Sequence, residues 1–348
     1  MSEDDFLWRY NLKYVNLGKS GLKVSQLCLG TMMFGGATNE QDSIKIVHRS
    51  LDDGINFIDT ANGYNNGLSE EIVGKALLGR RNEVVLTTKV NASMGNGPND
   101  GGLSRYHILQ EVENSLRRLQ TDHIDVYMLH RPDPLTPLEE SLESLGILLS
   151  QGKIRYIGMS NHKAWQVRDA LAILDALRLP QVSVVQDLYN MFNRDIEVEL
   201  LPFCGAFGVG SMVYSPLARG VLTGKYMSGV ELPTGSRAAR GDDRIHQTEL
   251  RDESLNIVGD LIELSKSHDK TLSQFALNWV IGNPLVSSAV IGPRTFDQYE
   301  DNLGAVGWDI TEVALLKIDD LIPPGEHTGK GFNDPMNPVT GRPKEIKI

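Results

Sequence analysis

INFIDTANGYNNGLSEEIVGKAL, residues 55–77, contains the most complete unit of secondary structure in the chain. Its first four residues have the composition of a buried strand, the strand stops at Asp59, and a polar loop containing Tyr64 follows. Ser69 then precedes two glutamates and an apolar helical pattern, as at the start of many helices. The segment therefore predicts one β/α unit, with Asp59 at the carboxyl end of its strand.

The same alternation of strand and helix continues along the chain. Apolar segments of strand length occur at 26–32, 55–61, 83–90, 123–130, 154–161, 182–190, 209–217 and 287–294. Amphipathic helical patterns separate them, at 42–53, 70–78, 104–119, 137–151, 163–177, 196–207 and 272–281. Short apolar strands without strict alternation are typical of parallel strands buried on both faces.

Eight such strands separated by helices predict an α/β fold, a closed (β/α)8 TIM barrel. A β-hairpin is expected before it, at residues 14–24, and long loops are expected on its carboxyl face, at 91–103 and 227–247. Residues 253–267 look helical. A doubly wound sheet is the alternative, but the first strand is not followed by the Gly-x-Gly-x-x-Gly of such a dinucleotide site.

The length suits one barrel with insertions, so we expect a single domain over residues 1–348. Within it, residues 1–13 are expected to form a solvated arm. The Pro/Gly-rich stretch 323–348 is expected to form a tail on the surface.

The net charge of −11 argues against nucleic acid or an anionic membrane as a partner, because the overall field repels both. This net charge does not exclude a local basic pocket. Two cysteines, Cys28 and Cys204, are too few for a disulfide framework, and we find no signal peptide or bilayer-spanning stretch. We therefore expect a cytoplasmic protein. No clustered His/Asp ligands accompany Asp59, so we expect no metal, and a barrel hydrolase lacks support.

Four residues near strand ends have side chains suited to catalysis: Asp59, Tyr64, Lys89 and His130. Singly, each has an ordinary structural explanation, such as a turn cap, a surface tyrosine or a hydrogen-bonded histidine. Because the carboxyl ends of parallel barrel strands converge on one face, we expect all four to share one cleft.

Together these groups suit proton-coupled hydride transfer. A lysine ammonium lowers the pKa of a neighbouring phenol, and Asp59 would keep Lys89 charged and oriented. Tyr64 could then give a proton to a carbonyl oxygen as hydride reaches the carbon, while His130 hydrogen-bonds to the same oxygen.

Several ordered blocks between Tyr14 and Ala305 resemble the aldo-keto reductase family, among them VVLTTKV, GKIRYIGMSN, YSPLARGVLTGKY and IGPRTFDQYEDNL. The style is closest to the branch containing bacterial oxidoreductases and potassium-channel β subunits. The resemblance implies the TIM barrel and an enzyme that interconverts a small-molecule aldehyde or ketone with its alcohol. It also implies that the four residues above form the catalytic tetrad, with none missing.

The resemblance further implies a nicotinamide cofactor. Ser160, Asn161 and Gln186 would bind its carboxamide, and Tyr214 would stack on its ring. We favour NADP(H) over NAD(H), because a guanidinium such as that of Arg294 pairs with a phosphate in a bidentate manner. Arg237 could reach the same phosphate. The complete expected set is Gly30, Thr31, Met32, Asp59, Ser160, Asn161, Gln186, Tyr214, Ser215, Leu217, Arg219, Gly220, Lys225, Arg237, Gly292, Arg294, Gln298, Asp301 and Asn302.

The chain departs from the family's pattern at a few positions. Asp301 stands where a glutamate is frequent, His162 where an aromatic residue is frequent, and Met32 and Met33 where a large group such as tryptophan is frequent. The last three face the substrate in relatives, so they leave the substrate open. Arg118, with Arg117, is expected on a helix surface without a role in binding.

A second function belongs to another class. The chain could be a cofactor-sensing binding subunit of a larger complex, like the channel β subunits, with slow or vestigial carbonyl reduction. No apolar patch for a partner is evident in the sequence, which argues weakly against it. The sequence leaves the oligomeric state and the direction of the reaction open.

Overall fold

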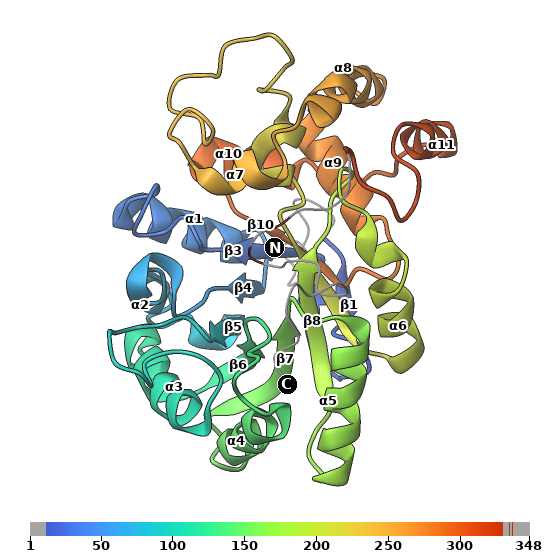
Figure 1. The fold of residues 1–348 in the computed structure, drawn as a ribbon. Coiled ribbons are helices and arrows are strands. Elements are labelled where there is room, and N and C mark those ends of the chain that lie inside the picture. The colour runs from blue at the N-terminus through green and yellow to red at the C-terminus, as the bar shows by residue number, and fades with distance from the viewer. Residues whose placement is uncertain (1–11, 330–333, 335, 337–348) are drawn as a thin grey trace, which may run out of the picture.

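A computed structural model describes residues 12–329, 334 and 336 (Figure 1). Eight parallel strands close into a barrel in the order β10-β3-β4-β5-β6-β7-β8-β9, which confirms the predicted (β/α)8 fold. The strands are β3 (Leu27–Gly30), β4 (Phe57–Asp59), β5 (Val85–Val90), β6 (Ile124–Leu129), β7 (Ile154–Ser160), β8 (Val182–Leu188), β9 (Gly210–Tyr214) and β10 (Ser288–Ile291).

Helices surround the strands in Figure 1 and bury their apolar faces against the outside of the barrel. The α-helices are α1 (Glu40–Asp52), α2 (Leu68–Ala76), α3 (Arg105–Leu119), α4 (Leu138–Ser150), α5 (Ala164–Ala176), α6 (Leu200–Phe207), α7 (Asp243–Thr248), α8 (Asp252–Lys266), α9 (Leu272–Ile281), α10 (Phe296–Leu303) and α11 (Glu312–Leu321). Short 3-10 helices are η2 (Tyr64–Gly67), η3 (Arg81–Glu83), η4 (Asp195–Glu197) and η5 (Ala218–Thr223). None of the helices in the described ranges combines the length and apolar character that a bilayer span requires.

Three short helices were absent from the expected pattern. Helix α7 lies at the end of the predicted loop 227–247, because the Asp242 side chain accepts a hydrogen bond from Ile245 N and Ile245 is buried. Helices α10 and α11 begin at capping threonines, Thr295 and Thr311. The predicted arm lies almost wholly outside the described residues, as does most of the predicted tail.

The barrel interior changes character along each strand. Side chains point alternately into and out of a barrel, so every second residue lines the interior. Toward the amino ends these residues are apolar and form one buried cluster, including Cys28, Phe57, Val85, Val126, Met128, Val184, Met212 and Val290. One inward position further along, they become polar: Asp59 follows Phe57, Gln186 follows Val184, and His130 follows Met128. The apolar cluster therefore forms a floor beneath a polar mouth.

The predicted hairpin closes the floor from below. Strands β1 (Tyr14–Asn16) and β2 (Lys23–Ser25) pair antiparallel, and the buried Leu17 and Val24 join the apolar cluster. Gly18 has a φ of +60°, and a Cβ there would lie 2.5 Å from the backbone nitrogen of Gly210. Only glycine fits a hairpin packed this closely against the barrel.

This packing predicts how much the protein is destabilised when a side chain of the apolar cluster is removed. Leu17→Ala should lower the free energy of unfolding by about 2–5 kcal/mol, because a fully buried side chain leaves a cavity in a closed cluster. Leu135→Ala is the matched control, since that leucine is 93% exposed and its loss should have little effect. Urea unfolding of both variants measures the difference, and equal stabilities would contradict the role of the hairpin.

Candidate active site

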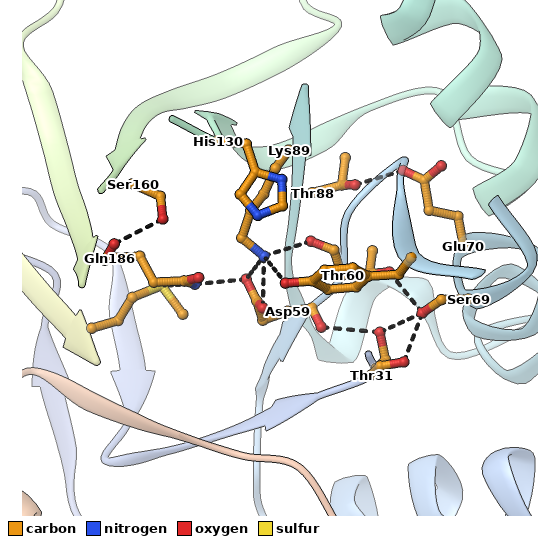
Figure 2. Close-up of polar contacts among 12 residues, drawn as sticks. Thr31, Asp59, Thr60, Ser69, Glu70, Thr88, Lys89, His130, Ser160 and Gln186 are labelled. Atoms are coloured by element: carbon orange, nitrogen blue, oxygen red, sulfur yellow. Dashed lines mark hydrogen bonds and ion pairs between the residues drawn. The ribbon is translucent and has the colours of Figure 1, made fainter. Parts of the chain in front are cut away.

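The residues expected to be catalytic meet at the mouth of the barrel. Lys89, on β5, is completely buried, and its Nζ lies 2.7 Å and 2.8 Å from the two carboxylate oxygens of Asp59, on β4. The same Nζ donates to the backbone oxygen of Thr60 at 2.8 Å and to Tyr64 Oη at 3.3 Å. Lysine, carboxylate and phenol thus form one connected group (Figure 2).

A second layer of hydrogen bonds holds this group in place (Figure 2). Gln186 Nε2, from β8, donates to Asp59 Oδ1 at 2.8 Å. Ser69 Oγ lies 3.0 Å from Thr60 Oγ1 and 2.8 Å from Thr31 Oγ1, which joins the loops after β3 and β4. The carboxylate and its neighbouring strand end are therefore fixed from both sides of the barrel wall.

Burial and charge act in opposite directions on the two titrating groups. Burial alone would lower the pKa of the Lys89 ammonium, but Asp59 and Tyr64 outweigh it, and the net pKa lies above the ordinary value. For Tyr64, burial raises the phenol pKa more than Lys89 lowers it. Lys89 therefore does lower the pKa of the Tyr64 phenol, as predicted, but the net pKa is still raised. Tyr64 is protonated at neutral pH, as a proton donor must be.

His130 directly follows β6. Its ring packs edge-on against the ring of Tyr64, with centroids 5.9 Å apart. Burial, then the charges of Lys89 and Arg131, hold the pKa of the imidazole well below its usual range, so the ring is neutral. Its Nδ1 is buried without a hydrogen-bond partner among the described residues.

A buried ionic network lies behind the tetrad and corrects one expectation. Arg118, expected on a helix surface, donates to Glu70 at 2.6 Å and pairs with Glu111, and its side chain is only 16% exposed. Thr88 Oγ1 donates to the other Glu70 oxygen at 2.5 Å. Thr88 precedes Lys89 on β5, so this network anchors the strand that carries the lysine. The sequence hid it because Glu70, on α2, and Thr88, on β5, lie far from Arg118 along the chain.

A cavity of about 540 Å³ opens above the tetrad. Asp59, Tyr64 and His130 line it, whereas Lys89 lies behind them. Every residue of the expected cofactor set lines the same cavity, from Gly30 after β3 to Asn302 on α10. Tyr214 Oη donates to Asn161 Oδ1 at 2.8 Å, which links β9 to the loop after β7. The structure thus gathers the whole set around one space, and the roles assigned to its members stay predictions.

One wall of the cavity is crowded with cations. Arg219 and Lys225 lie in the segment after β9, with Arg237 and Arg240 beyond them. Burial lowers the pKa of Arg219 and of Lys225, and neighbouring arginines lower both further. Lys225 has no ion-pair partner among the described residues. A cluster of cations that repel one another is suited to a ligand with several negative charges.

The backbone beside these cations is strained. Ser215, Ala218 and Arg219 have φ values of 55°, 46° and 52°, in the left-handed region that residues with a Cβ rarely adopt, and Gly220 follows at 100°. Successive residues of this kind form concave turns whose N–H groups bind anions. Such conformations persist where the surrounding structure imposes them, commonly at ligand sites.

Some cavity residues were missed by sequence reasoning. Arg131 directly follows His130, and this position could have identified it as a cavity residue. Arg244 and Met336 come from segments without a clear sequence pattern. Arg244 pairs with Asp334 through both guanidinium nitrogens, at 2.6 Å and 2.7 Å. Within the described ranges no three His, Cys, Asp or Glu side chains gather as a metal-binding cluster.

His162 does not face the cavity, contrary to expectation. It is buried, and its Nδ1 lies 2.8 Å from the backbone oxygen of Ser160. Met32 and Met33 do line the cavity, as expected. Its apolar surface on that side therefore comes from the loop after β3.

Asp187, next to Gln186 on β8, is a buried carboxyl that sequence reasoning also missed. Only 8% of it is exposed, and its Oδ2 has no hydrogen-bond partner among the described residues. Burial raises the pKa of Asp187 to about 7, against the opposing effects of Lys163 and the Asn161 backbone. The carboxyl is therefore partly protonated at neutral pH.

The site and the barrel define a class of protein, a barrel oxidoreductase. A family model described as the Aldo/keto reductase family matches residues 26–322. The oxidoreductase YrpG of Bacillus subtilis, itself called uncharacterized, is 38% identical over 334 residues, which are 92% of this chain and 99% of that protein. A probable voltage-gated potassium channel subunit beta of Arabidopsis thaliana is 40% identical over 319 residues, 89% of this chain and 97% of that protein.

The aldo-keto reductase YhdN of Bacillus subtilis is 35% identical over 339 residues, 94% of this chain and 97% of that protein. The chain belongs to the aldo/keto reductase family. It is an oxidoreductase, and members of its family use nicotinamide cofactors.

The raised pKa of the buried Asp187 carboxyl predicts a pH-dependent change in stability. A carboxyl whose pKa is raised by folding stabilises the folded state most below its ordinary pKa of 3.8, and this contribution is lost as the pH rises to about 7. Asp187→Asn should therefore gain roughly 2 kcal/mol of unfolding free energy relative to the native chain between pH 5 and pH 8. Urea unfolding at both pH values measures the gain.

Asp169→Asn, at an exposed position of α5, is the matched control and should show no such change. A constant difference between Asp187→Asn and the native chain across this pH range would show that Asp187 titrates normally.

Proposed function

We propose that the protein is an NADPH-linked reductase that interconverts an aldehyde or ketone and its alcohol, with Tyr64 as the general acid and base. One observation carries the proposal: a single buried ammonium, Lys89 Nζ, bonds to both oxygens of Asp59 and to Tyr64 Oη. The phenol thereby has a fixed position and a charged neighbour at the mouth of a cavity.

The cavity residues fit a phosphorylated dinucleotide. The cations after β9 repel one another, Lys225 has no ion-pair partner among the described residues, and the strained turn at 215–220 lies beside them. Gln186 and Asn161 would hold a carboxamide above Asp59, and Tyr214 would lie against the ring. A bound nicotinamide supplies or accepts the hydride.

The tetrad would handle the proton. Tyr64 gives its proton to the carbonyl oxygen of the substrate, and Lys89 stabilises the phenolate that this step leaves. Asp59 keeps the ammonium charged. It also keeps the ammonium in place, because Gln186 holds its side chain and Thr31 holds its backbone oxygen. The neutral His130 donates a hydrogen bond to the same carbonyl oxygen, which lowers the energy of the charge that develops there.

The preference for NADPH rests on two arginines at the far end of the cationic wall. Arg294 lines the cavity, and its Nη1 donates to the backbone oxygen of Gly235 at 2.9 Å, with no ion-pair partner among the described residues. Arg237 pairs with Asp242 at 2.8 Å, so part of its charge is already used. Arg294 is therefore the stronger candidate for a 2′-phosphate.

The relatives named as channel subunits favour a second candidate function. The chain is 40% identical to one of them over 89% of its length, which suits a cofactor-sensing subunit of a larger complex. The complete tetrad favours turnover instead, since each of its members is present and in contact. A broad carbonyl panel separates the two: turnover supports the reductase, and bound NADPH without turnover supports the subunit.

The proposal treats residues 1–348 as one domain and places it in the cytoplasm. Both cysteines, Cys28 and Cys204, are buried as free thiols, which suits a reducing compartment. Small-molecule carbonyl compounds or alcohols are the proposed substrates.

Tyr64→Phe tests the assignment of the acid. The rate at which the enzyme reduces an aldehyde should fall about 10²- to 10⁴-fold, because the hydroxyl that gives the proton is gone. NADPH affinity should stay nearly unchanged, since the ring and its packing remain. Tyr106→Phe is the matched control, because Tyr106 is 62% exposed on α3. NADPH absorbance follows turnover, and normal turnover by Tyr64→Phe would remove Tyr64 from the acid role.

Arg294→Met tests the choice of cofactor. It should weaken NADPH binding about 10- to 100-fold through the loss of charge-assisted bonds to a phosphate, with NADH binding unchanged. Arg105→Met, a change of an exposed arginine outside the cavity, should alter neither. Fluorescence titration gives both dissociation constants. An equal loss for NADPH and NADH would place Arg294 away from the 2′-phosphate.

A further inference from the structure

Arg131 is a cation of the cavity that the proposed cofactor does not require. Seven Lys and Arg side chains among the described residues line the cavity, and six of them come from the segments around β9 and β10: Arg219, Lys225, Arg237, Arg240, Arg244 and Arg294. Arg131 is the seventh and follows β6. In the closed barrel, β6 lies four strands from β10 in both directions, on the opposite wall.

The side chain of Arg131 has no internal counter-ion. It makes no hydrogen bond or ion pair with any other described residue, although it is partly buried. The nearby Asp133 is occupied, because its carboxylate accepts from the backbone nitrogens of Leu103 and Leu135 and from Thr136 Oγ1. A partly buried guanidinium without a partner loses hydration that a ligand anion can replace.

The other charges near the tetrad do not offer this attraction. The Lys89 ammonium is neutralised by Asp59 at 2.7 Å, so the pair presents little net charge to the cavity. The Asp301 carboxylate, on the opposite wall, is an anion that accepts hydrogen bonds from Thr271 and Gln274, so it offers no attraction to a ligand anion. Arg131 is thus, among the described residues, a cavity-lining positive charge without a counter-ion that directly follows His130 in the chain.

We infer that Arg131 is a specificity-determining residue that selects carbonyl substrates carrying an anionic substituent, a carboxylate or a phosphate. The inference rests on the proposed reductase function and adds the substrate class. The guanidinium holds the anion while the carbonyl faces Tyr64 and His130, and the anion takes no part in the transfer of hydride and proton. Met32 and Met33 line the cavity as well and offer apolar contact to the body of such a substrate.

Matched substrate pairs test the inference. With NADPH, kcat/KM should be at least tenfold higher for 4-carboxybenzaldehyde than for its neutral methyl ester, or for glyceraldehyde 3-phosphate than for glyceraldehyde. The pair that shows the preference identifies the anion. Arg131→Met should remove most of the preference through a higher KM for the anionic member, while the neutral member changes less than twofold. Arg131→Lys should restore part of it.

The controls separate the possible failures. The neutral substrate and the dissociation constant for NADPH report folding and cofactor binding in each variant, and Arg105→Met repeats the loss of one positive charge outside the cavity. An equal fall for both members of a pair would overturn the inference, because Arg131 would then act on the reacting oxygen or on the fold. Native enzyme without any anionic preference would overturn it too, with the reductase function intact. Failure to reduce any aldehyde or ketone of the broad carbonyl panel while NADPH is bound would overturn both.

Discussion

The ion pair between Lys89 and Asp59 is the constraint around which the site is built. A fully buried ammonium is tolerated only because a carboxylate and a backbone oxygen satisfy it, and removal of either charge would leave the other buried and unpaired. Gln186 reaches this pair from β8, and the hydroxyls of Thr60, Ser69 and Thr31 connect it to the loops nearby. The position of Tyr64 follows from this arrangement.

The distribution of charge would allow an acidic chain to bind an anion. The overall charge is −11, whereas cations among the described residues line the cavity on two opposite walls. Charge in a partly enclosed, poorly hydrated space is screened less than charge on the surface. The local potential, and not the net charge, therefore governs which ligands this site attracts.

Much of the fold followed from local patterns, because apolar strands, helix caps and the two-residue alternation are visible within a few residues. The barrel and the placement of Asp59, Lys89 and His130 on one face were predictable for this reason. The network of Arg118 was not, since Glu70 lies 48 residues away in the sequence. The net pKa of Tyr64 depends on burial, which only the assembled structure provides. The same is true of the burial of His162 away from the cavity.

The apolar floor has a consequence for the supply of protons. Behind Lys89 the barrel is packed with side chains such as Met128 and Met212, and the hairpin seals the far end. If Tyr64 donates its proton at each turnover, the apolar side chains of this described cluster are poor carriers for its replacement. Replacement through the opening that admits the substrate is then favoured, and the departure of one product and the recharging of the acid would share a single route.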